Sequence, residues 1–508
     1  MKVHLLYPDR DFDFGSTISG AQNDVVQDLE LDGVFGAMAL GDKYLREVCS
    51  RVMLGGMTDP AEICYRQAIL EDFVACPDML TELYQTAVQA IEDRKNAWGL
   101  WGRSSKSVTA ILSGSVRELE LYASVLRRLR SAADTYEATA RSRGLLQFFA
   151  SLRENLDEDY FAEIGQHLKH LRFGQGVLMS AELGGDNTGI DFVLRVPNPT
   201  KKGLMERLGF GPKNSYSFSI HPRDEAGARI LEDLRCRGIN LVANSVAQSA
   251  DHIESYFAIM RSELGFYVGC LNLRSALKRT PGPLCYPDPF PLGESILHAS
   301  DLRDASLTLH ATGRVVGNDL GADGCTLVMV TGANSGGKST FLRSLGLAMV
   351  MMQAGMYVCA SSFGASVCTG LFTHFIRKED ESMESGRLDD ELVRMSATAD
   401  KLVSGSTMLF NESFATTAER EGSEIARQVV GALLDSGIRV LFVTHQYDLA
   451  ESLYTSGRAD HAVFLRAERE EDGHRSFKMV VHEPLPTAYG QDLYTRIFVS
   501  ATPEGAHD

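Results

Sequence analysis

A glycine-rich run that begins at residue 332 contains the residue types that bind phosphate. Its members are Gly332, Ala333, Asn334, Ser335, Gly336, Gly337, Lys338, Ser339 and Thr340. Glycines let backbone N–H groups turn toward phosphate oxygens, and the N-terminus of a following helix adds positive potential. A lysine at this position reaches the terminal phosphates, and a serine hydroxyl can ligate Mg²⁺. The run therefore predicts an ATP site in which Lys338 binds phosphate and Ser339 binds the metal.

Two further polar residues follow apolar stretches downstream. Glu412 comes soon after the apolar residues 407–410, and His445 comes soon after residues 439–443. A carboxylate at the end of such a strand can position and activate the water that attacks a phosphate. A histidine at the end of a neighbouring strand can contact the γ-phosphate or that water. We therefore expect both residues to be catalytic, although Glu412 could instead cap the next segment and His445 could be structural.

Asn411, directly before Glu412, is a departure from the usual pattern. A Walker B strand ordinarily ends in Asp and then Glu, and the aspartate helps to hold the water shell of Mg²⁺. An amide oxygen accepts hydrogen bonds but carries no charge, and Mg²⁺ prefers carboxylate oxygens. We expect Asn411 to contribute to the metal site indirectly, with weaker retention of Mg²⁺ or slower turnover of ATP as the consequence.

These residues can meet only if the strands that carry them lie in one sheet. Apolar residues 326–330 precede the glycine-rich run, and residues 341–347 continue it as a helix. Strands that alternate with helices are typical of an α/β domain. Five of the 15 prolines fall within residues 280–294, which marks a domain boundary. The sequence thus predicts an α/β P-loop ATPase domain over residues 285–508.

The chain before this boundary has mainly helical periodicity. Apolar residues recur at spacings of three and four over residues 37–165 and again over residues 225–264. Three stretches between these regions are instead β-prone and bounded by turn residues: 173–180, 190–195 and 215–221. We expect a mainly α-helical domain over residues 1–284, with a small β-containing insertion at about residues 172–222.

The motifs of the nucleotide site resemble those of the MutS mismatch-repair family. The resemblance is carried by TGANSGGKSTFLRSLGL at 331–347, QAGMYVCASSFG at 353–364, the Asn411–Glu412 strand end and VTHQYDLAESL at 443–453. The segment LGGMTDPAEICYRQAILEDF at 54–73 also resembles the one that opens the helical lever domain of that family. The resemblance implies an ABC-type ATPase, active as a dimer, whose helical levers and clamp embrace double-stranded or branched DNA.

The chain also departs from this family in two places. It begins at the lever domain, so we expect no counterpart of the domains that read mismatches and connect them to the levers. Where the family has the sequence GGRST, this chain has Ser385, Gly386 and Arg387 followed by Leu388 and acidic residues. The resemblance implies that Ser385, Gly386 and Arg387 form a signature-like segment that acts on the partner's nucleotide. The alternative is a solvated loop.

The charge of the chain limits how it could bind DNA. Lys and Arg number 50 against 67 Asp and Glu, which gives a net charge of -17 and excludes a generally basic, nucleic-acid-coating protein. One local basic patch stands out, and its members are Arg195, Lys201, Lys202, Arg207 and Lys213. Such a loop suits contact with DNA phosphates, with an ordinary solvated loop as the alternative. A second cluster, Arg127, Arg128 and Arg130, favours a solvated helical face.

Two functions of different classes follow from these observations. The first is a MutS-related ATPase that clamps on recombination or repair intermediates without reading mismatches itself. The second is a nucleotide-gated scaffold for protein interactions with little or no ATP hydrolysis, which Asn411 and the altered signature segment favour. A protein partner is consistent with the acidic composition. A transporter ATPase is disfavoured because no LSGGQ-type sequence precedes Asn411. For the adenine ring the sequence offers only Phe290 as a candidate, and that residue could equally be a packing residue.

The cysteines and the N-terminal residues indicate in which cellular compartment the protein is found. The nine cysteines form no CxxC pair, and the N-terminal residues turn acidic within ten positions. Free thiols in a reducing compartment are the expected state of such cysteines. We therefore expect a cytoplasmic protein with no membrane segment.

Overall fold

The computed structural model describes residues 2–15, 20–98, 107–174, 176–195, 218–332, 336–377, 386–456, 461–469 and 475–485. The chain divides into two compact units. Unit 1 comprises Met1–Val3, Thr81–Ala138 and Leu146–Arg261, and unit 2 comprises His4–Leu80, Thr139–Leu145 and Ser262–Asp508. The domain boundary that we expect between residues 284 and 285 falls inside unit 2 and stays a prediction.

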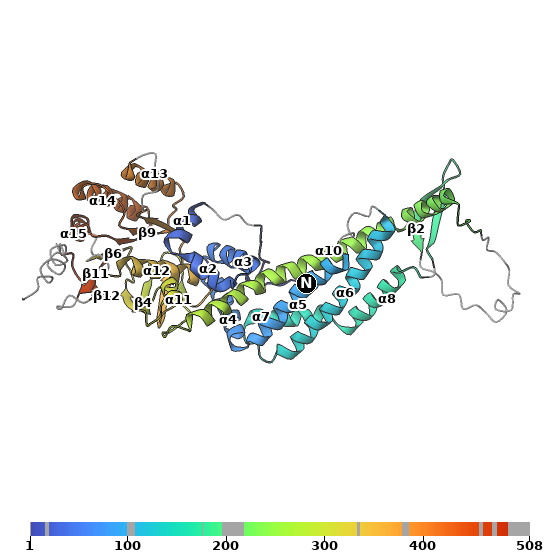
Figure 1. Cartoon of the computed structure of the whole chain (residues 1–508), viewed down its shortest axis with the longest axis horizontal. Coiled ribbons are helices and arrows are strands. Elements are labelled where there is room, and N and C mark those ends of the chain that lie inside the picture. The colour runs from blue at the N-terminus through green and yellow to red at the C-terminus, as the bar shows by residue number, and fades with distance from the viewer. Residues whose placement is uncertain are drawn as a thin grey trace, which may run out of the picture. The chain divides into compact units, whose positions relative to one another are not determined.

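Unit 1 consists mainly of long helices, which run side by side in Figure 1. Its helices are most of α5 (Pro77–Trp98), α6 (Val108–Tyr136), most of α7 (Arg143–Asn155), α8 (Glu158–Leu171) and the first part of α10 (Glu225–Leu277). Leu112 and Val116 lie one helical turn apart on α6, and they share a buried cluster with Ile239 and Val246 of α10. The apolar spacing of the sequence therefore produces the predicted helices, because each apolar stripe is buried against its neighbours.

Among the described residues of unit 1, the β-containing part is a single hairpin. Strands β1 (Leu178–Leu183) and β2 (Gly189–Arg195) pair antiparallel, as the two β-prone stretches predict. The third predicted strand is not formed in its described part, residues 218–221. Phe218 there is 85% exposed, and β1 and β2 pair only with each other among the described strands. Without a neighbouring strand or a buried face, a β-prone sequence has nothing to pair with.

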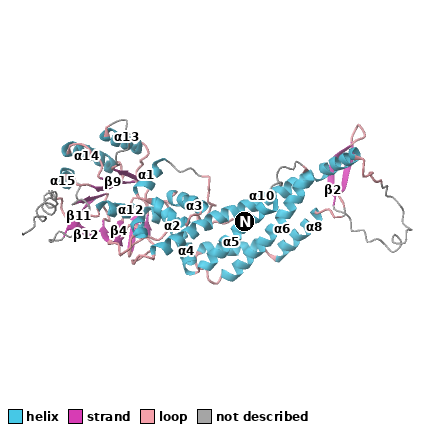
Figure 2. Ribbon diagram, in the orientation of Figure 1, coloured by secondary structure: helices cyan, strands magenta, loops and turns pink. Residues whose placement is uncertain are grey.

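Unit 2 is built around a six-stranded sheet, shown in magenta in Figure 2. The strand order is β12 (Arg475–Val481), β11 (Ala462–Arg469), β6 (Leu327–Thr331), β10 (Arg439–Val443), β9 (Thr407–Asn411) and β8 (Leu371–Phe375). All neighbours pair parallel except β11 and β12. The central strands are apolar between their end residues, which suits parallel strands that are covered on both faces.

Helices cover the two faces of this sheet. They are α12 (Lys338–Gln353), α13 (Arg387–Ala399), α14 (Glu419–Asp435) and α15 (Tyr447–Thr455). Met329, Phe410 and Phe442 point toward one face and share a buried cluster with Val430 of α14. The alternate residue Leu409 points toward the other face, where a Cβ on Gly346 of α12 would lie 2.8 Å from its Cδ2 atom. The strands thus place a continuous core on each side of the sheet.

A second sheet and the N-terminal helices complete unit 2. The smaller sheet has the order β3 (Asp288–Phe290), β7 (Ser362–Ser366), β4 (Leu297–Leu302) and β5 (Asn318–Gly321), and the short helix α11 (Ala305–His310) follows β4. The N-terminal helices are α1 (Gly20–Asp28), α2 (Leu31–Ala39), α3 (Lys43–Leu54) and α4 (Pro60–Ala75). They contact β8, α11, α12 and β3 respectively. The fully buried Arg66 of α4 donates to the carbonyls of Leu6 and Ala354.

Within the described parts of the chain, no helix has both the length and the apolar character that crossing a membrane demands. The described helices are instead amphipathic or are buried inside one of the two units. All nine cysteines are free thiols, as the sequence predicts.

Candidate functional site

The three strands that carry the predicted site residues are neighbours in the large sheet. β10 lies between β6 and β9 and is parallel to both, so the carboxyl ends of the three strands share one edge. The backbone continues this pairing beyond the strands: Thr444 N donates to Val330 O at 3.0 Å, and Glu412 N donates to Val443 O at 2.9 Å. The residues that follow each strand are therefore brought together, as in other α/β folds that bind ligands at this edge.

The glycine-rich run connects β6 to α12 at this edge. Gly332 and Gly337 have φ values of +112° and +88°, a region that glycine adopts without strain. Gly337 is the N-cap of α12, and Gly336 directly before it is buried. Thr340 lies in the first turn of the helix. Residues 333–335, which include the predicted Ala333, Asn334 and Ser335, lie outside the described residues.

Lys338 is the first residue of α12 and is almost completely buried. Its side chain is 4% exposed, and Nζ donates to the carbonyl oxygen of Gly332 at 2.9 Å. Nζ also lies 3.6 Å from Oε1 of Glu412. Burial lowers the pKa of the lysine, and the neighbouring carboxylate opposes this change. The result is a buried ammonium group beside a carboxylate, at a helix N-terminus that itself carries positive potential.

Glu412 and His445 form the closest polar pair at this edge. Oε2 of Glu412 lies 2.6 Å from Nδ1 of His445 and also accepts the backbone N–H of His445 at 3.1 Å. A carboxylate only accepts hydrogen bonds, so Nδ1 carries the hydrogen. The hydrogen bond to Glu412 is the main cause of a raised pKa at His445, with burial acting against it. The ring orientation and the carboxylate orientation are thus fixed by each other.

Ser339 and Asn411 are joined directly. Ser339 Oγ donates to Oδ1 of Asn411 at 2.8 Å. Both atoms are hard oxygen donors of the kind that Mg²⁺ binds, so the donor chemistry fits the ion, although neither side chain carries a charge. The predicted relation between the P-loop serine and the residue before Glu412 is therefore present in the geometry, while their role at a metal stays a prediction.

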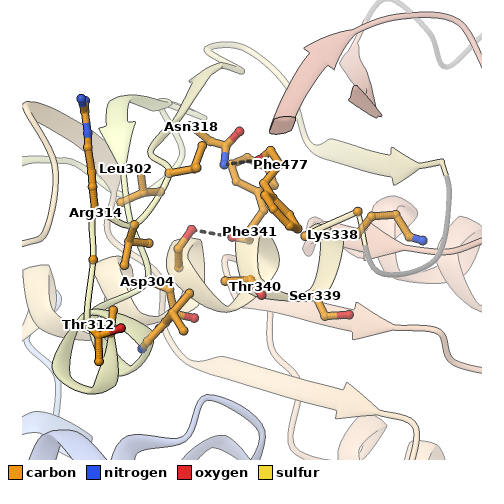
Figure 3. Close-up of a pocket in the computed structure, with 18 of the residues that line it drawn as sticks. Leu302, Asp304, Thr312, Arg314, Asn318, Lys338, Ser339, Thr340, Phe341 and Phe477 are labelled. Carbon is orange, nitrogen blue, oxygen red and sulfur yellow. Dashed lines mark hydrogen bonds between the residues drawn. The ribbon is translucent and has the colours of Figure 1, made fainter. Parts of the chain in front are cut away.

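A cavity of about 770 Å³ opens beside the start of α12. Its volume falls in the range of sites that bind small molecules. Figure 3 shows Lys338, Ser339 and Thr340 on the helix at one side, with Thr312 and Arg314 at the other side, on the segment before β5. Glu412 also lines the cavity. The residues that the sequence predicts to bind phosphate thus lie at one end of a space that is large enough for a nucleotide.

The remaining walls contain residues that the sequence did not point to. Phe477 of β12 lines the cavity, and its carbonyl accepts the side-chain amide of Asn318 at 3.2 Å (Figure 3). Phe477 is far from the glycine-rich run in the sequence, so no local motif predicts that it lines the cavity. Phe290, the candidate from sequence, does not line the cavity, because it lies on β3 with its ring against His298 at 6.1 Å.

The residues predicted to act in trans and on DNA are described only in part. Gly386 is the N-cap of α13 and Arg387 is its first residue, whereas Ser385 lies outside the described residues. Arg195 ends β2, is exposed and donates to Ser180 Oγ at 2.9 Å. The other members of the basic patch also lie outside the described residues: Lys201, Lys202, Arg207 and Lys213.

The second basic cluster, on α6, belongs to the surface of that helix. The guanidinium of Arg127 lies 4.6 Å from the ring centroid of Phe161, and Arg130 pairs with Asp134 one turn along the same helix. These contacts agree with the interpretation of the cluster as a solvated helical face, because both of these arginines already have a partner within unit 1.

Comparison with known proteins gives matches over most of the chain. The family model of the MutS2 N-terminal domain matches residues 58–280, and that of MutS domain V matches residues 328–499. The chain belongs to the MutS family. The resemblance seen in the sequence motifs is therefore confirmed. Lys338, Glu412 and His445 lie in the part that matches MutS domain V.

The similar curated proteins are themselves MutS proteins. A DNA mismatch repair protein MutS from Streptococcus thermophilus is 28% identical over 165 residues, which are 32% of this chain and 19% of that protein. One from Chloroflexus aurantiacus is 25% identical over 225 residues, 43% of this chain and 23% of that protein. One from Shouchella clausii is 33% identical over 156 residues, 29% and 18% of the two chains. The match thus spans about a fifth of the length of these MutS relatives.

Proposed function

We propose that this MutS-family chain is an ATPase that couples ATP binding and hydrolysis to clamping on DNA. The observation that carries the proposal is the meeting of Lys338, Glu412 and His445 at one sheet edge, within the match to MutS domain V. A buried cation, a carboxylate and a histidine at this edge are groups that phosphoryl transfer to water uses. The relatives named as DNA mismatch repair proteins support DNA as the partner.

Lys338 would supply the charge that binds the terminal phosphates of ATP. Its ammonium group is buried and shares its surroundings with one carboxylate, Glu412. Phosphate oxygens are stronger partners for such a group than the carbonyl of Gly332, because they carry negative charge and add Coulombic attraction to the hydrogen bond. The backbone N–H groups at the start of α12 would add to phosphate binding.

Glu412 would act as the base in hydrolysis. The water oxygen forms a bond to the γ-phosphorus while the bond from that phosphorus to the bridging oxygen breaks, and ADP leaves with the electron pair. Glu412 accepts the proton of the water. His445 keeps the carboxylate in place through two hydrogen bonds, and it would sense the γ-phosphate from this position.

Mg²⁺ would supply charge neutralisation at the β- and γ-phosphates. Ser339 Oγ is the protein oxygen that we assign to the ion, and Asn411 Oδ1 would act on its water shell. An amide at position 411 attracts the ion less than a carboxylate does. We therefore propose a metal site that retains Mg²⁺ weakly and an ATPase that is slow for this reason.

DNA contact is assigned to unit 1. Its helices and hairpin belong to the MutS2 N-terminal match, and the basic patch of Arg195, Lys201, Lys202, Arg207 and Lys213 begins at the end of β2. The patch suits phosphates of double-stranded or branched DNA.

A homodimer would present Ser385, Gly386 and Arg387 to the nucleotide of the partner. The free thiols support a cytoplasmic location for this protein.

The DNA proposal is tested by equilibrium binding. Linear, mismatched and four-way duplexes are titrated with the purified chain in the presence of ATP, in the presence of ADP and without nucleotide. We expect binding that changes with the nucleotide and shows no preference for the mismatch. No nucleotide-dependent change on any of the three DNA substrates would contradict the clamp.

A nucleotide-gated scaffold is the second candidate, and Asn411 is the observation that favours it. Ser339 donates its hydrogen bond to the neutral amide of Asn411, at a position where a Walker B strand ordinarily has a carboxylate. ATP binding by calorimetry and phosphate release, measured on the same preparation, distinguish the two functions. Turnover in the wild type supports the ATPase, and a faster rate in Asn411→Asp would show that the amide limits it. Tight binding without measurable turnover supports the scaffold.

A further inference from the structure

The turn that follows β9 has a backbone that needs support. Glu412 and Phe414 have φ values of +54° and +61°, in the left-handed region that non-glycine residues rarely adopt. Ser413 between them is completely buried. Such a turn persists only where surrounding contacts determine it. The groups that hold this turn therefore also determine where the Glu412 carboxylate lies.

Glu391 of α13 holds the turn from one side. Its Oε2 atom accepts the backbone N–H of Phe414 at 2.8 Å, and the residue is 4% exposed. Burial raises the pKa of this carboxyl, and the hydrogen bond from Phe414 opposes the rise. Truncation of Glu391 would remove the acceptor of a buried N–H group, which is costly in free energy.

His374 of β8 connects α13 to the same turn. Its Nε2 lies 3.1 Å from the carbonyl oxygen of Glu391, so Nε2 carries the hydrogen. Burial lowers the pKa of His374 to about 4. Its Nδ1 lies 2.9 Å from Ser413 Oγ, and the Ser413 hydroxyl donates to the backbone carbonyl oxygen of His374 at 2.5 Å. The ring also stacks on Phe414, with centroids 5.4 Å apart and planes at 20°.

The third side of the turn is closed by α14. A Cβ atom on Gly422 would lie 2.1 Å from the carbonyl oxygen of Phe414, so only glycine permits this approach. The same carbonyl accepts the side-chain amide of Gln446 at 3.3 Å. With its carbonyl and its N–H both engaged, Phe414 has little freedom to move away from Glu391.

We propose that Glu391 is a positioning residue for Glu412, so that helix α13 determines where the Glu412 carboxylate lies. The contact passes from the Glu391 carboxylate to Phe414 N and through the buried turn to Glu412, whose oxygens face Lys338 and His445. Glu391 does not itself line the cavity. The proposal rests on the proposed ATPase function, because positioning matters only if Glu412 does chemistry.

The proposed contact also connects the start of α13 to the Glu412 turn. The helix begins at Arg387, directly after Gly386, and Glu391 lies on its second turn. A helix moves as a rigid element over such a short length. Any displacement of Gly386 and Arg387 would therefore reach the Glu412 turn through the Glu391 carboxylate, without a change in the contacts of the P-loop.

The test compares Glu391→Ala with the conservative Glu391→Gln and with Asp389→Ala. Asp389 is an exposed carboxylate on the same helix, so its removal is a matched control. We expect Glu391→Ala to lower kcat for ATP about ten- to a hundred-fold, because small misplacements of reacting groups have large effects on rate. KM for ATP should change by less than about two-fold, since Lys338 keeps its partners. Glu391→Gln keeps an acceptor oxygen and should restore most of kcat.

A second measurement does not depend on turnover. Amide hydrogen exchange over residues 411–416 of the nucleotide-free protein should accelerate in Glu391→Ala and stay unchanged in Glu391→Gln and Asp389→Ala. If the wild type releases no phosphate while exchange behaves as expected, the ATPase proposal fails and the support of the turn by Glu391 stands. Unchanged exchange, or equal losses of kcat in the Ala and Gln variants, would overturn the positioning role.

Discussion

Glu412 is the residue that contacts both His445 and Lys338 at the candidate site. Its two oxygens face different partners: Oε2 is hydrogen-bonded to Nδ1 of His445, and Oε1 lies 3.6 Å from the Lys338 ammonium. One carboxylate therefore compensates a buried lysine and fixes a histidine in the nucleotide-free protein. Binding of a triphosphate would offer Lys338 a second source of negative charge. Glu412 could then leave the lysine and keep His445 as its partner, which is the arrangement that water activation needs.

The pair between His445 and Glu412 predicts a pH dependence of stability. The hydrogen bond to Glu412 raises the pKa of His445 in the folded chain above its value of about 6.5 in an unfolded chain. The stabilisation is therefore fully present below about pH 6.5 and is lost as the pH rises through the folded pKa. Urea unfolding of wild type and His445→Gln should differ most below this pH. A difference that grows toward alkaline pH would contradict the assignment.

Phe477 gives a second prediction at this scale. It lines the cavity, and a Cβ on Gly337 would lie 3.4 Å from its Cδ1 atom, so we expect its ring to pack against a bound nucleotide at the end of the cavity beside the glycine-rich run. Burial of a Phe side chain contributes about 1.5–3 kcal/mol, so Phe477→Ala should weaken ATP binding by roughly 10- to 150-fold. Calorimetric titration measures this change. Phe290→Ala is the control, because Phe290 lies away from the cavity and should leave the affinity unchanged.

At the scale of elements, the arrangement depends on strand ends and on close helix contacts. The parallel pairing of β6, β10 and β9 brings three loops to one edge. α13 and α14 then approach the turn after β9 from two sides, through Glu391 and Gly422. The pairing of the strands brings the site residues together. Contacts from α13 and α14 hold the strained turn after β9 in place.

Gly422 gives the prediction that belongs to this scale. A Cβ at this position would meet a backbone oxygen at 2.1 Å, which neither partner can avoid by rotating a side chain. Overpacking of this kind costs about 1–3 kcal/mol, so Gly422→Ala should lower the free energy of unfolding by that amount. Gly431→Ala on the same helix meets nothing within 4 Å and should instead be neutral or stabilising. Equal effects of the two substitutions in denaturant unfolding would contradict this account of α14.

The sequence allowed the strands but not the packing to be predicted. Apolar runs ending near residues 331, 411 and 443 have a local signal, and so does the glycine-rich run between strand and helix. No local signal predicts the contact of Glu391 with Phe414, the placement of Phe477 or the packing of His4–Leu80 in unit 2. Each of these joins positions far apart in the chain, and residue type alone does not specify which distant partner is met.

At the scale of the whole molecule, the net charge of -17 limits how the protein can bind DNA. An acidic protein is repelled by duplex DNA at long range, so any grip must come from a local cluster of cations. The basic patch that begins at Arg195 is such a cluster, and it follows the hairpin of unit 1. We therefore expect a narrow contact with phosphates that weakens steeply with salt.

Reversal of charge in the patch tests this expectation. Lys201, Lys202 and Lys213 changed together to Glu should weaken duplex binding and lower the slope of log K against log salt by about 0.9 for each DNA phosphate that the variant no longer neutralises. Arg128→Glu on the face of α6 is the control and should change the slope little. A salt titration in which the triple variant matches the wild type would contradict DNA binding through the patch.

The central claim is that Glu412 performs chemistry on ATP held by Lys338. Its most direct test is steady-state phosphate release by wild type and Glu412→Gln in Mg²⁺ and ATP, with ATP affinity measured on the same samples. We expect slow release by the wild type and loss of release in Glu412→Gln, while ATP binding is retained. Release by Glu412→Gln at the wild-type rate would contradict this claim.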